Sequence, residues 1–202
     1  MTNLIEILKH KKLLWQGNTE EHSDHLLVNS GFDELDQHLT GGFPSHGVVE
    51  LLSQIGIGEL RLLAPLLSSN SKEQLNVFIN PPGHLYAPML AAVGINVANV
   101  VVIYSSAIND ALWSSEQCLK SGCCSNVLLW SNAHCLQVHQ IKRLQVAAEQ
   151  GQSRHFILRN DKHESIGLPV DLSLSLNATT EGLSVRINKR KRGWPSNWFD
   201  IN

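Results

Sequence analysis

The chain has 202 residues and a mass of 22.4 kDa, with 43% hydrophobic residues, 17% charged residues and a net charge of -2 at pH 7. This length fits one domain with a substantial core, and the composition is that of a globular protein, which excludes a disordered chain. The slightly acidic balance argues against a generally basic nucleic-acid-binding protein, and no apolar run reaches the roughly 20 residues of a membrane span. Because Lys9, Lys11 and Lys12 follow the first short apolar segment and do not precede it, we expect no signal peptide and a cytoplasmic protein without membrane contact.

The first segment is expected to be an amphipathic helix from Asn3 to Trp15, because Leu4, Ile7 and Leu8 share one helical face. A polar stretch over residues 17–24 follows and is typical of a linker. Such a helix either caps its own domain or binds a groove on a partner, and the sequence leaves both alternatives open. The expected organisation is a helix and linker over residues 1–24, a single domain over residues 25–193, and an aromatic C-terminal tail over residues 194–202.

Beyond residue 25, strands and helices alternate. A short helix near Asp33–Asp36 ends at the glycine turn Gly41–Gly42. Short runs rich in β-branched residues then alternate with longer helical segments, which predicts an α/β fold with a mainly parallel sheet covered on both faces. The expected strands cover residues 48–52, 76–80, 100–103, 126–130 and 155–159, and the expected helices lie near residues 60–68, 86–93, 108–120 and 138–150.

The C-terminal part has a different pattern. Val170–Leu176 alternates strictly between apolar and polar residues, and Gly182–Lys189 does so again. This alternation predicts an antiparallel hairpin added to the sheet, with one face exposed to solvent.

The segment Ser53–Leu60 lies where a phosphate-binding loop belongs, between a buried strand and a helix, with glycines at Gly56 and Gly58. A P-loop ends in Gly-Lys-Ser/Thr, whose lysine neutralises phosphate charge and whose hydroxyl binds Mg²⁺. Here Gly58 is followed by Glu59 and Leu60. A carboxylate repels a triphosphate and an alkyl group cannot bind a metal ion, so the sequence predicts a degenerate loop without nucleotide, metal or other cofactor.

The segment from Val28 to Leu51 resembles the entry to the RecA core. It contains a serine-glycine turn, a leucine-aspartate helix, the Gly41–Pro44 turn and a glycine-led strand. Phe78–Asn80 and the segment from Leu90 to Val101 resemble the RecA core after its second strand. The resemblance covers most of the chain in order, and it implies a RecA-like fold.

At three places the chain departs from the RecA pattern at residues that bind or hydrolyse ATP. Glu59 and Leu60 replace the P-loop lysine and hydroxyl residue, Pro82 falls where the family has its catalytic glutamate, and Trp130 falls where an aspartate ends the strand that supports Mg²⁺. Together these departures argue against ATP hydrolysis, and we found no catalytic triad or carboxylate pair elsewhere. The expectation is therefore a protein that is not an enzyme.

Within RecA-like proteins, the chain is most similar to the ImuA/SulA group of bacterial SOS-response proteins. The resemblance to ImuA implies an accessory role in damage-induced translesion synthesis, with an ImuB-like protein and an error-prone polymerase subunit as partners and RecA as a further candidate. SulA shares the region from Leu51 to Leu158 in outline and inhibits cell division by binding FtsZ, so this role stays open as the alternative. The entry from Val28 to Pro44 favours ImuA. The segments that carry the ImuA resemblance are Gly56–Leu63, Pro81–Pro88, Ala111–Gln117 and Arg143–Glu149.

A dense basic cluster precedes the aromatic tail. The cations can contact phosphates of single-stranded DNA while an aromatic ring stacks on a base, or the tryptophans can anchor a protein partner. The alternative is a solvated strand end whose tryptophans fold back on the domain. The candidate contact residues are Lys189, Arg190, Lys191, Arg192, Trp194 and Trp198.

The four cysteines, Cys118, Cys123, Cys124 and Cys135, lack the paired spacing of a zinc site. We expect them to be small buried residues in a reducing compartment, with redox sensing or metal binding as the alternative.

Overall fold

The computed structural model describes residues 27–69, 73–132, 136–160, 167–180, 182–191 and 193–201. The predicted N-terminal helix and linker, together with Arg192 and Cys135, lie outside the described residues.

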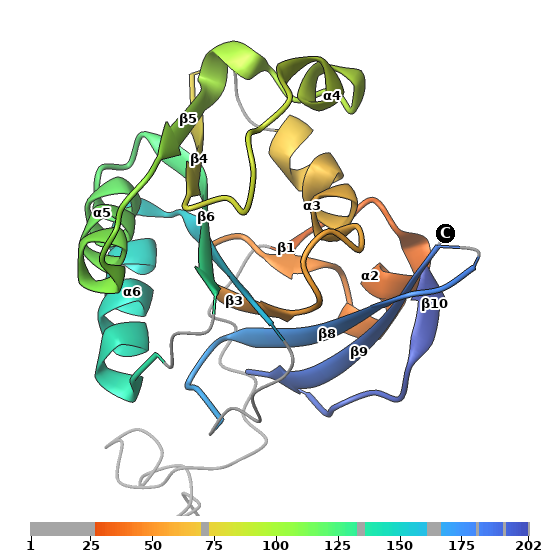
Figure 1. Ribbon diagram of the computed structural model, residues 1–202. Helices are drawn as coiled ribbons and strands as arrows, with labels where there is room; N and C mark the ends of the chain where they lie inside the picture. The colour runs from red at the N-terminus through yellow and green to blue at the C-terminus, as the bar shows by residue number, and fades with distance from the viewer. Residues whose placement is uncertain are drawn as a thin grey trace, which may run out of the picture.

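An eight-stranded sheet forms the centre of the molecule, in the order β10-β9-β8-β3-β7-β6-β4-β5 (Figure 1). Every neighbouring pair from β8 to β5 is parallel, whereas β8 with β9 and β9 with β10 are antiparallel. The predicted fold class, a mainly parallel sheet with a C-terminal antiparallel hairpin, is confirmed. The strands are β3 (Gly47–Leu52), β4 (Leu75–Ile79), β5 (Val100–Ile103), β6 (Cys124–Asn132), β7 (Arg154–Arg159), β8 (Leu172–Ala178), β9 (Leu183–Arg190) and β10 (Phe199–Ile201).

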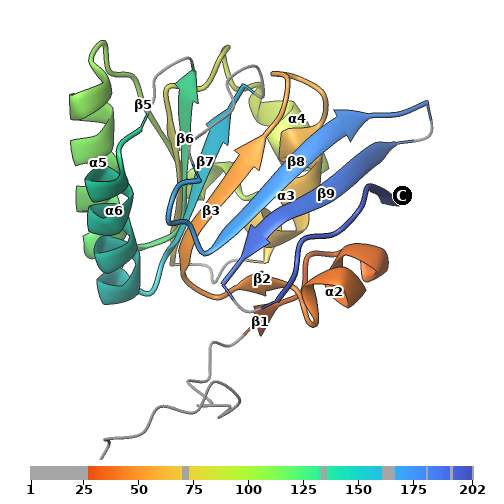
Figure 2. The same ribbon diagram turned by 90° about the horizontal axis from the view of Figure 1, so that it is seen from below.

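Helices cover both faces of the sheet, as Figure 2 shows. One face carries α5 (Ile108–Lys120) and α6 (Val138–Gly151), and the other carries α2 (Asp33–Leu39), α3 (Glu59–Ser68) and α4 (Ala87–Ala92). Successive strand residues point to opposite faces, so Phe78 of β4 joins the core beneath α3 while its neighbours Val77 and Ile79 join the core beneath α5 and α6. Among the described helices, none has the length and apolar character needed to cross a membrane.

The segment before the central strand is built into the core. Strand β1 (Leu27–Val28) pairs antiparallel with β2 (Phe43–Pro44), and α2 connects the two strands in the sequence. The Ser30 N–H donates to the Asp36 carboxylate at 2.9 and 3.2 Å, which fixes the turn into the helix. Gly42 has φ +119°, and a Cβ there would lie 2.2 Å from the carbonyl oxygen of Val28, so this turn requires glycine.

The C-terminal hairpin differs from its prediction in one respect. The serines of β8, Ser173 and Ser175, were expected on a face exposed to solvent, but both are buried, as is Ser184 of β9. The Ser173 and Ser175 hydroxyls contact polar side chains of neighbouring strands, and the Ser184 hydroxyl donates to the Phe199 carbonyl of β10 at 3.3 Å. The sequence also gave no indication of β10, which pairs with β9 and adds a third antiparallel strand.

Candidate functional site

The loop between β3 and α3 has the backbone of an anion-binding turn. Gly56 and Gly58 have φ +86° and +120°, values that L side chains rarely adopt. The loop follows the carboxyl end of a central parallel strand and leads directly into the N-terminus of α3, where backbone N–H groups lack partners within the helix. The strand, glycine turn and helix predicted for Ser53–Leu60 are thus present.

The side chain of Glu59 fills this turn. Its two carboxylate oxygens accept from the Gly56 N–H at 3.0 and 3.2 Å, and Oε2 also accepts from the Gly58 N–H at 3.2 Å. Glu59 is only 5% exposed. A negative group at a helix N-terminus is stabilised by the free N–H groups there, which is the interaction that a P-loop offers to phosphate. At this position, an internal carboxylate therefore occupies the donors that a nucleotide would need.

The space beside the loop is too small for a nucleotide. The hollow next to Glu59 has a volume of about 10 Å³, enough for roughly one water molecule. Trp130 closes it from β6, and this buried indole stacks on Phe78 with ring centroids 6.1 Å apart. Small-molecule sites usually offer about 300–1,000 Å³. The described lining residues are Ser53, Ile55, Glu59, Trp130, Leu158, Arg159 and Asn160.

Pro82 and Trp130 lie together at the carboxyl ends of β4 and β6, beside a second cavity of about 540 Å³. None of its described lining residues is acidic or basic, so it offers no carboxylate to activate water. The described residues also contain no group of three or more His, Cys, Asp or Glu side chains that could bind a metal ion. The cavity is lined by Asn80, Pro81, Pro82, Tyr104, Ser105, Ser106, Ile108 and Trp130.

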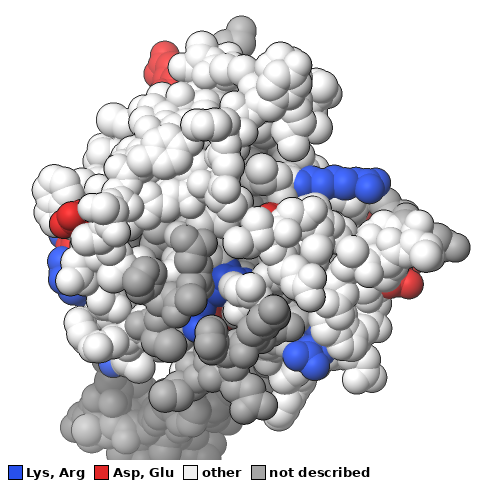
Figure 3. Space-filling view, viewed as in Figure 1, with Lys and Arg blue, Asp and Glu red and all other residues white. Residues whose placement is uncertain are grey.

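The described residues of the basic cluster, Lys189, Arg190 and Lys191, contact different parts of the domain. Lys189 Nζ donates to the Leu168 carbonyl at 2.9 Å, and Lys191 Nζ lies 3.5 Å from Asp171 Oδ1. Arg190 Nη1 donates instead to the carbonyl of His38 in α2, at 3.0 Å. Lys189 and Arg190 are adjacent in β9 and point to opposite faces of the sheet, whereas Arg190 and Lys191 line the same cavity of about 600 Å³. On the face shown in Figure 3, basic side chains are scattered.

The two tryptophans of the predicted contact site differ in their surroundings. Trp194 is 84% exposed. Trp198 is 39% exposed, and the Arg186 guanidinium lies 5.1 Å from its ring centroid, within the range of a cation–π contact. Trp194 is therefore the tryptophan available to a partner, whereas Trp198 already has a contact in its own domain.

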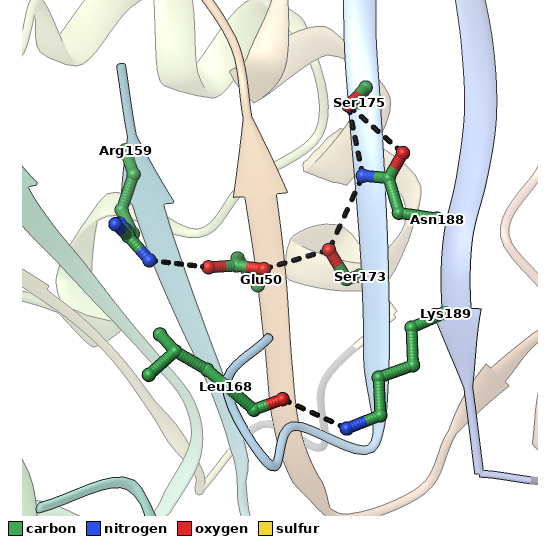
Figure 4. A network of polar contacts seen from close by, with 7 residues as sticks. All are labelled: Glu50, Arg159, Leu168, Ser173, Ser175, Asn188 and Lys189. Atoms are coloured by element: carbon green, nitrogen blue, oxygen red, sulfur yellow. Dashed lines mark hydrogen bonds and ion pairs between the residues drawn. The ribbon is translucent and has the colours of Figure 1, made fainter. Parts of the chain in front are cut away.

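A buried polar network crosses the sheet next to the loop (Figure 4). Arg159 of β7 and Glu50 of β3 form an ion pair with 2.7 Å between Nη1 and Oε1, and both side chains are buried. The other Glu50 oxygen accepts from the Ser173 hydroxyl at 2.7 Å. Asn188 of β9 donates to Ser173 at 3.4 Å and to Ser175 at 2.9 Å.

This network also supports the loop, because the Ser53 N–H donates to the Arg159 carbonyl at 2.9 Å. The network joins residues that lie far apart in the sequence, so no local pattern predicts it. The available signal was Glu50 itself, an acidic residue inside an otherwise apolar strand, where a buried carboxylate requires a partner.

The cysteines only partly follow the expectation of burial. Cys124 is buried and Cys118 is half-buried, but Cys123 is exposed, so the expectation is wrong for Cys123. A hydrogen bond between the Cys118 and Cys124 thiols lowers the pKa of Cys124 to about 7 and raises the pKa of Cys118.

No protein-family model matches the chain, and no curated protein does. Among solved structures, SulA from Pseudomonas aeruginosa is similar to this chain at 28% sequence identity, with a TM-score of 0.46. The similarity covers 55% of this chain and 97% of the SulA chain.

Proposed function

We propose that this protein is a non-catalytic accessory protein of the SOS response that supports translesion DNA synthesis through protein contacts. The observation that carries the non-catalytic part is the position of the Glu59 carboxylate on the Gly56 and Gly58 N–H groups. An ATPase needs these donors for phosphate, together with a lysine and a Mg²⁺ ligand. This chain places an anion on the donors and a tryptophan in the adjoining hollow.

A RecA-like core whose loop is filled by its own side chain has no nucleotide-driven switch. Its contribution would then be a constant binding surface on a rigid scaffold, with the chemistry left to its partners. The accessory role in translesion synthesis rests on the sequence resemblance to ImuA, and the partners proposed on that basis are an ImuB-like protein and an error-prone polymerase subunit. The segment Val28–Pro44 packs into the core. This supports the assignment, since the same segment is the part of the sequence that favours ImuA over SulA.

The second candidate is a cell-division inhibitor that binds FtsZ. It rests on the resemblance of the region from Leu51 to Leu158 to SulA. Both candidates predict a binding protein without nucleotide chemistry, so they differ only in the partner.

Binding measurements with the full chain discriminate between them. The immobilised protein is exposed in parallel to the ImuB-like protein, the polymerase subunit and FtsZ of the same organism, and the dissociation constants are compared. We expect micromolar or tighter binding to a polymerase component, about -8 kcal/mol or better, and none to FtsZ. Binding to FtsZ with inhibition of its polymerisation, without binding to polymerase components, would overturn the proposal in favour of the division inhibitor.

A further inference from the structure

The turn between α5 and β6 brings two thiols together. Cys118 lies in the last turn of α5 and Cys124 is the first residue of β6, so the two side chains come from elements that meet at this turn. Both pack against the core beneath α5 and α6, and they form the thiol–thiol hydrogen bond described above. Neither thiol is part of a disulfide.

The side chain of Ser121 fixes the geometry of this turn. Its hydroxyl donates to the Cys118 carbonyl at 2.7 Å, and its Oγ lies 3.7 Å from Cys124 Sγ. The Cys123 N–H donates to the same Oγ at 3.1 Å. One side chain therefore contacts both ends of the segment that a bond between the Cys118 and Cys124 sulfurs would close.

The third described cysteine, Cys123, does not belong to this pair. It is exposed, whereas Cys124 is only 3% exposed, and its thiol donates to the Ser121 carbonyl at 3.7 Å. Neighbouring residues of an extended chain point to opposite sides, so the Cys123 and Cys124 side chains diverge. Cys118 is therefore the described thiol that faces Cys124.

We propose that Cys118 and Cys124 are a modification site, at which a small hydroperoxide converts the two thiols into a disulfide that joins α5 to β6. In the first step, the Cys124 sulfur attacks a peroxide oxygen, the O–O bond breaks, and the released oxygen takes up a proton and leaves as water or an alcohol. Cys124 is now a sulfenic acid. In the second step, the Cys118 sulfur attacks Cys124 Sγ, the S–S bond forms and the S–O bond breaks. The departing hydroxide accepts the Cys118 proton to give water, so the two thiols are oxidised and the peroxide is reduced.

The surroundings of the two thiols assign these roles. The hydrogen bond from Cys118 outweighs burial and lowers the pKa of Cys124 to about 7, which provides thiolate at neutral pH. The pKa of Cys118 is raised by its hydrogen bond to Cys124, by burial and by the charge of the Cys124 thiolate. This charge disappears when Cys124 becomes a sulfenic acid, and Cys118 can then act as the second nucleophile.

The position of the pair selects the class of oxidant. Residues 120–123 form an exposed turn, Cys118 is half-buried, and a Cβ at Gly122 would meet nothing within 4 Å. The approach for an oxidant is therefore at this turn, past Cys118. Because Cys124 itself is buried, hydrogen peroxide and small alkyl hydroperoxides fit this approach better than a protein disulfide does.

This inference goes beyond the proposed function and does not depend on it, because it uses no residue of the loop or of the basic cluster. Treatment of the reduced full chain with hydrogen peroxide, followed by peptide mapping with mass spectrometry, tests it. We expect a disulfide between Cys118 and Cys124 and a mass lower by about 2 Da. Two of the four thiols of the chain should be lost, and dithiothreitol should restore them.

The matched control is Cys123→Ser, which removes an exposed thiol outside the pair and should leave the disulfide intact. Cys118→Ser should abolish the disulfide and leave Cys124 as a sulfenic acid that dimedone labels. Circular dichroism checks the fold of both variants, and mapping of the wild type decides the pairing without them. A disulfide that includes Cys123 or Cys135, a crosslinked dimer, or a thiol loss that dithiothreitol does not reverse would overturn the proposal, as would unmodified thiols at Cys118 and Cys124.

Discussion

The backbone N–H of Gly56 donates to both carboxylate oxygens of Glu59, at 3.0 and 3.2 Å. This contact joins the glycine that forms the turn to the first residue of α3. The same donors that bind phosphate in an ATPase are satisfied here by the chain itself. In the described structure these donors are therefore not free for an external anion.

Removal of the Glu59 carboxylate should destabilise the fold moderately. Glu59→Ala loses charge-assisted hydrogen bonds to the loop and a favourable charge at the N-terminus of α3, and water can replace part of both, so we expect a loss of about 1–2 kcal/mol in the free energy of unfolding. Urea denaturation measures it. Glu34→Ala, at an exposed position in the first turn of α2, serves as the control and should change stability by less than about 0.5 kcal/mol. Equal effects of the two variants would contradict the assigned role of Glu59.

The Glu50–Arg159 pair should behave as a buried ion pair. Glu50→Leu leaves the Arg159 guanidinium buried without its partner and should cost about 3–5 kcal/mol, whereas the double variant Glu50→Leu/Arg159→Met should recover much of this loss. Chemical denaturation of both singles and the double gives the coupling free energy. Lys191→Met provides the contrast, because Lys191 pairs with Asp171 at an exposed position and should contribute less than about 0.5 kcal/mol. Additive single effects would show that the two buried side chains are not coupled.

Burial of His155 should make stability depend on pH. Its side chain lies in β7 between Val48 and Val127 of the neighbouring strands, and desolvation lowers its pKa to about 3. The unfolded chain, with a histidine pKa of about 6.5, then binds the proton more readily than the folded chain. The stability conferred by the neutral histidine is therefore complete above about pH 6.5, the pKa in the unfolded chain. It is lost as the pH falls toward 3, by up to about 1.4 kcal/mol per pH unit.

His155→Leu should flatten this dependence. Unfolding free energies measured between pH 4 and pH 7 should fall less steeply for this variant than for the wild type, by about 1 kcal/mol per pH unit. His139→Gln, at an exposed position of α6, should retain the wild-type slope. An unchanged slope in His155→Leu would mean that His155 is not the group that titrates on unfolding.

Trp194 should contribute to binding and not to stability. Its ring is almost fully exposed, so Trp194→Ala should change the free energy of unfolding by less than about 0.5 kcal/mol. Binding to the partner or to single-stranded DNA at low salt should weaken by about 2 kcal/mol if this ring is an interface anchor or a base-stacking platform. Trp113→Ala, an exposed tryptophan on α5, is the matched control and should leave binding unchanged.

Replacing Lys189, Arg190, Lys191 and Arg192 together with alanine tests the cations, and unchanged binding at low salt would exclude them as contacts.

Local patterns in the sequence predicted the central fold well. The helix expected at residues 108–120 is α5, and the strands around Val48 and Phe78 are β3 and β4, because buried β-branched runs and 3.6-residue periodicity are local signals. The loop was also located correctly, and a glutamate at the start of a helix is expected to interact with the free N–H groups there, but its specific contact with the Gly56 N–H was not predicted. It depends on how the side chain folds back into the turn, which no spacing encodes.

The remaining differences between the sequence-based prediction and the structure arise from contacts between residues that are far apart in the sequence. The alternation at Ser173 and Ser175 correctly predicted a strand and wrongly predicted an exposed face, because the polar partner Glu50 comes from a strand far away in the sequence. In the run from Lys189 to Arg192, the Arg190 side chain contacts the His38 carbonyl and the Lys191 side chain contacts Asp171, and both partners come from distant parts of the sequence. Strand β10 is a three-residue segment in an aromatic tail, too short for a periodic pattern to indicate.

Calorimetric titration of the full chain with ATP and Mg²⁺ tests the central claim most directly, with a functional P-loop ATPase as the positive control. Because the Glu59 carboxylate occupies the phosphate donors, we expect no saturable heat up to about 1 mM nucleotide, which corresponds to a binding free energy weaker than about -4 kcal/mol. Saturable binding of ATP with a micromolar dissociation constant would contradict the account.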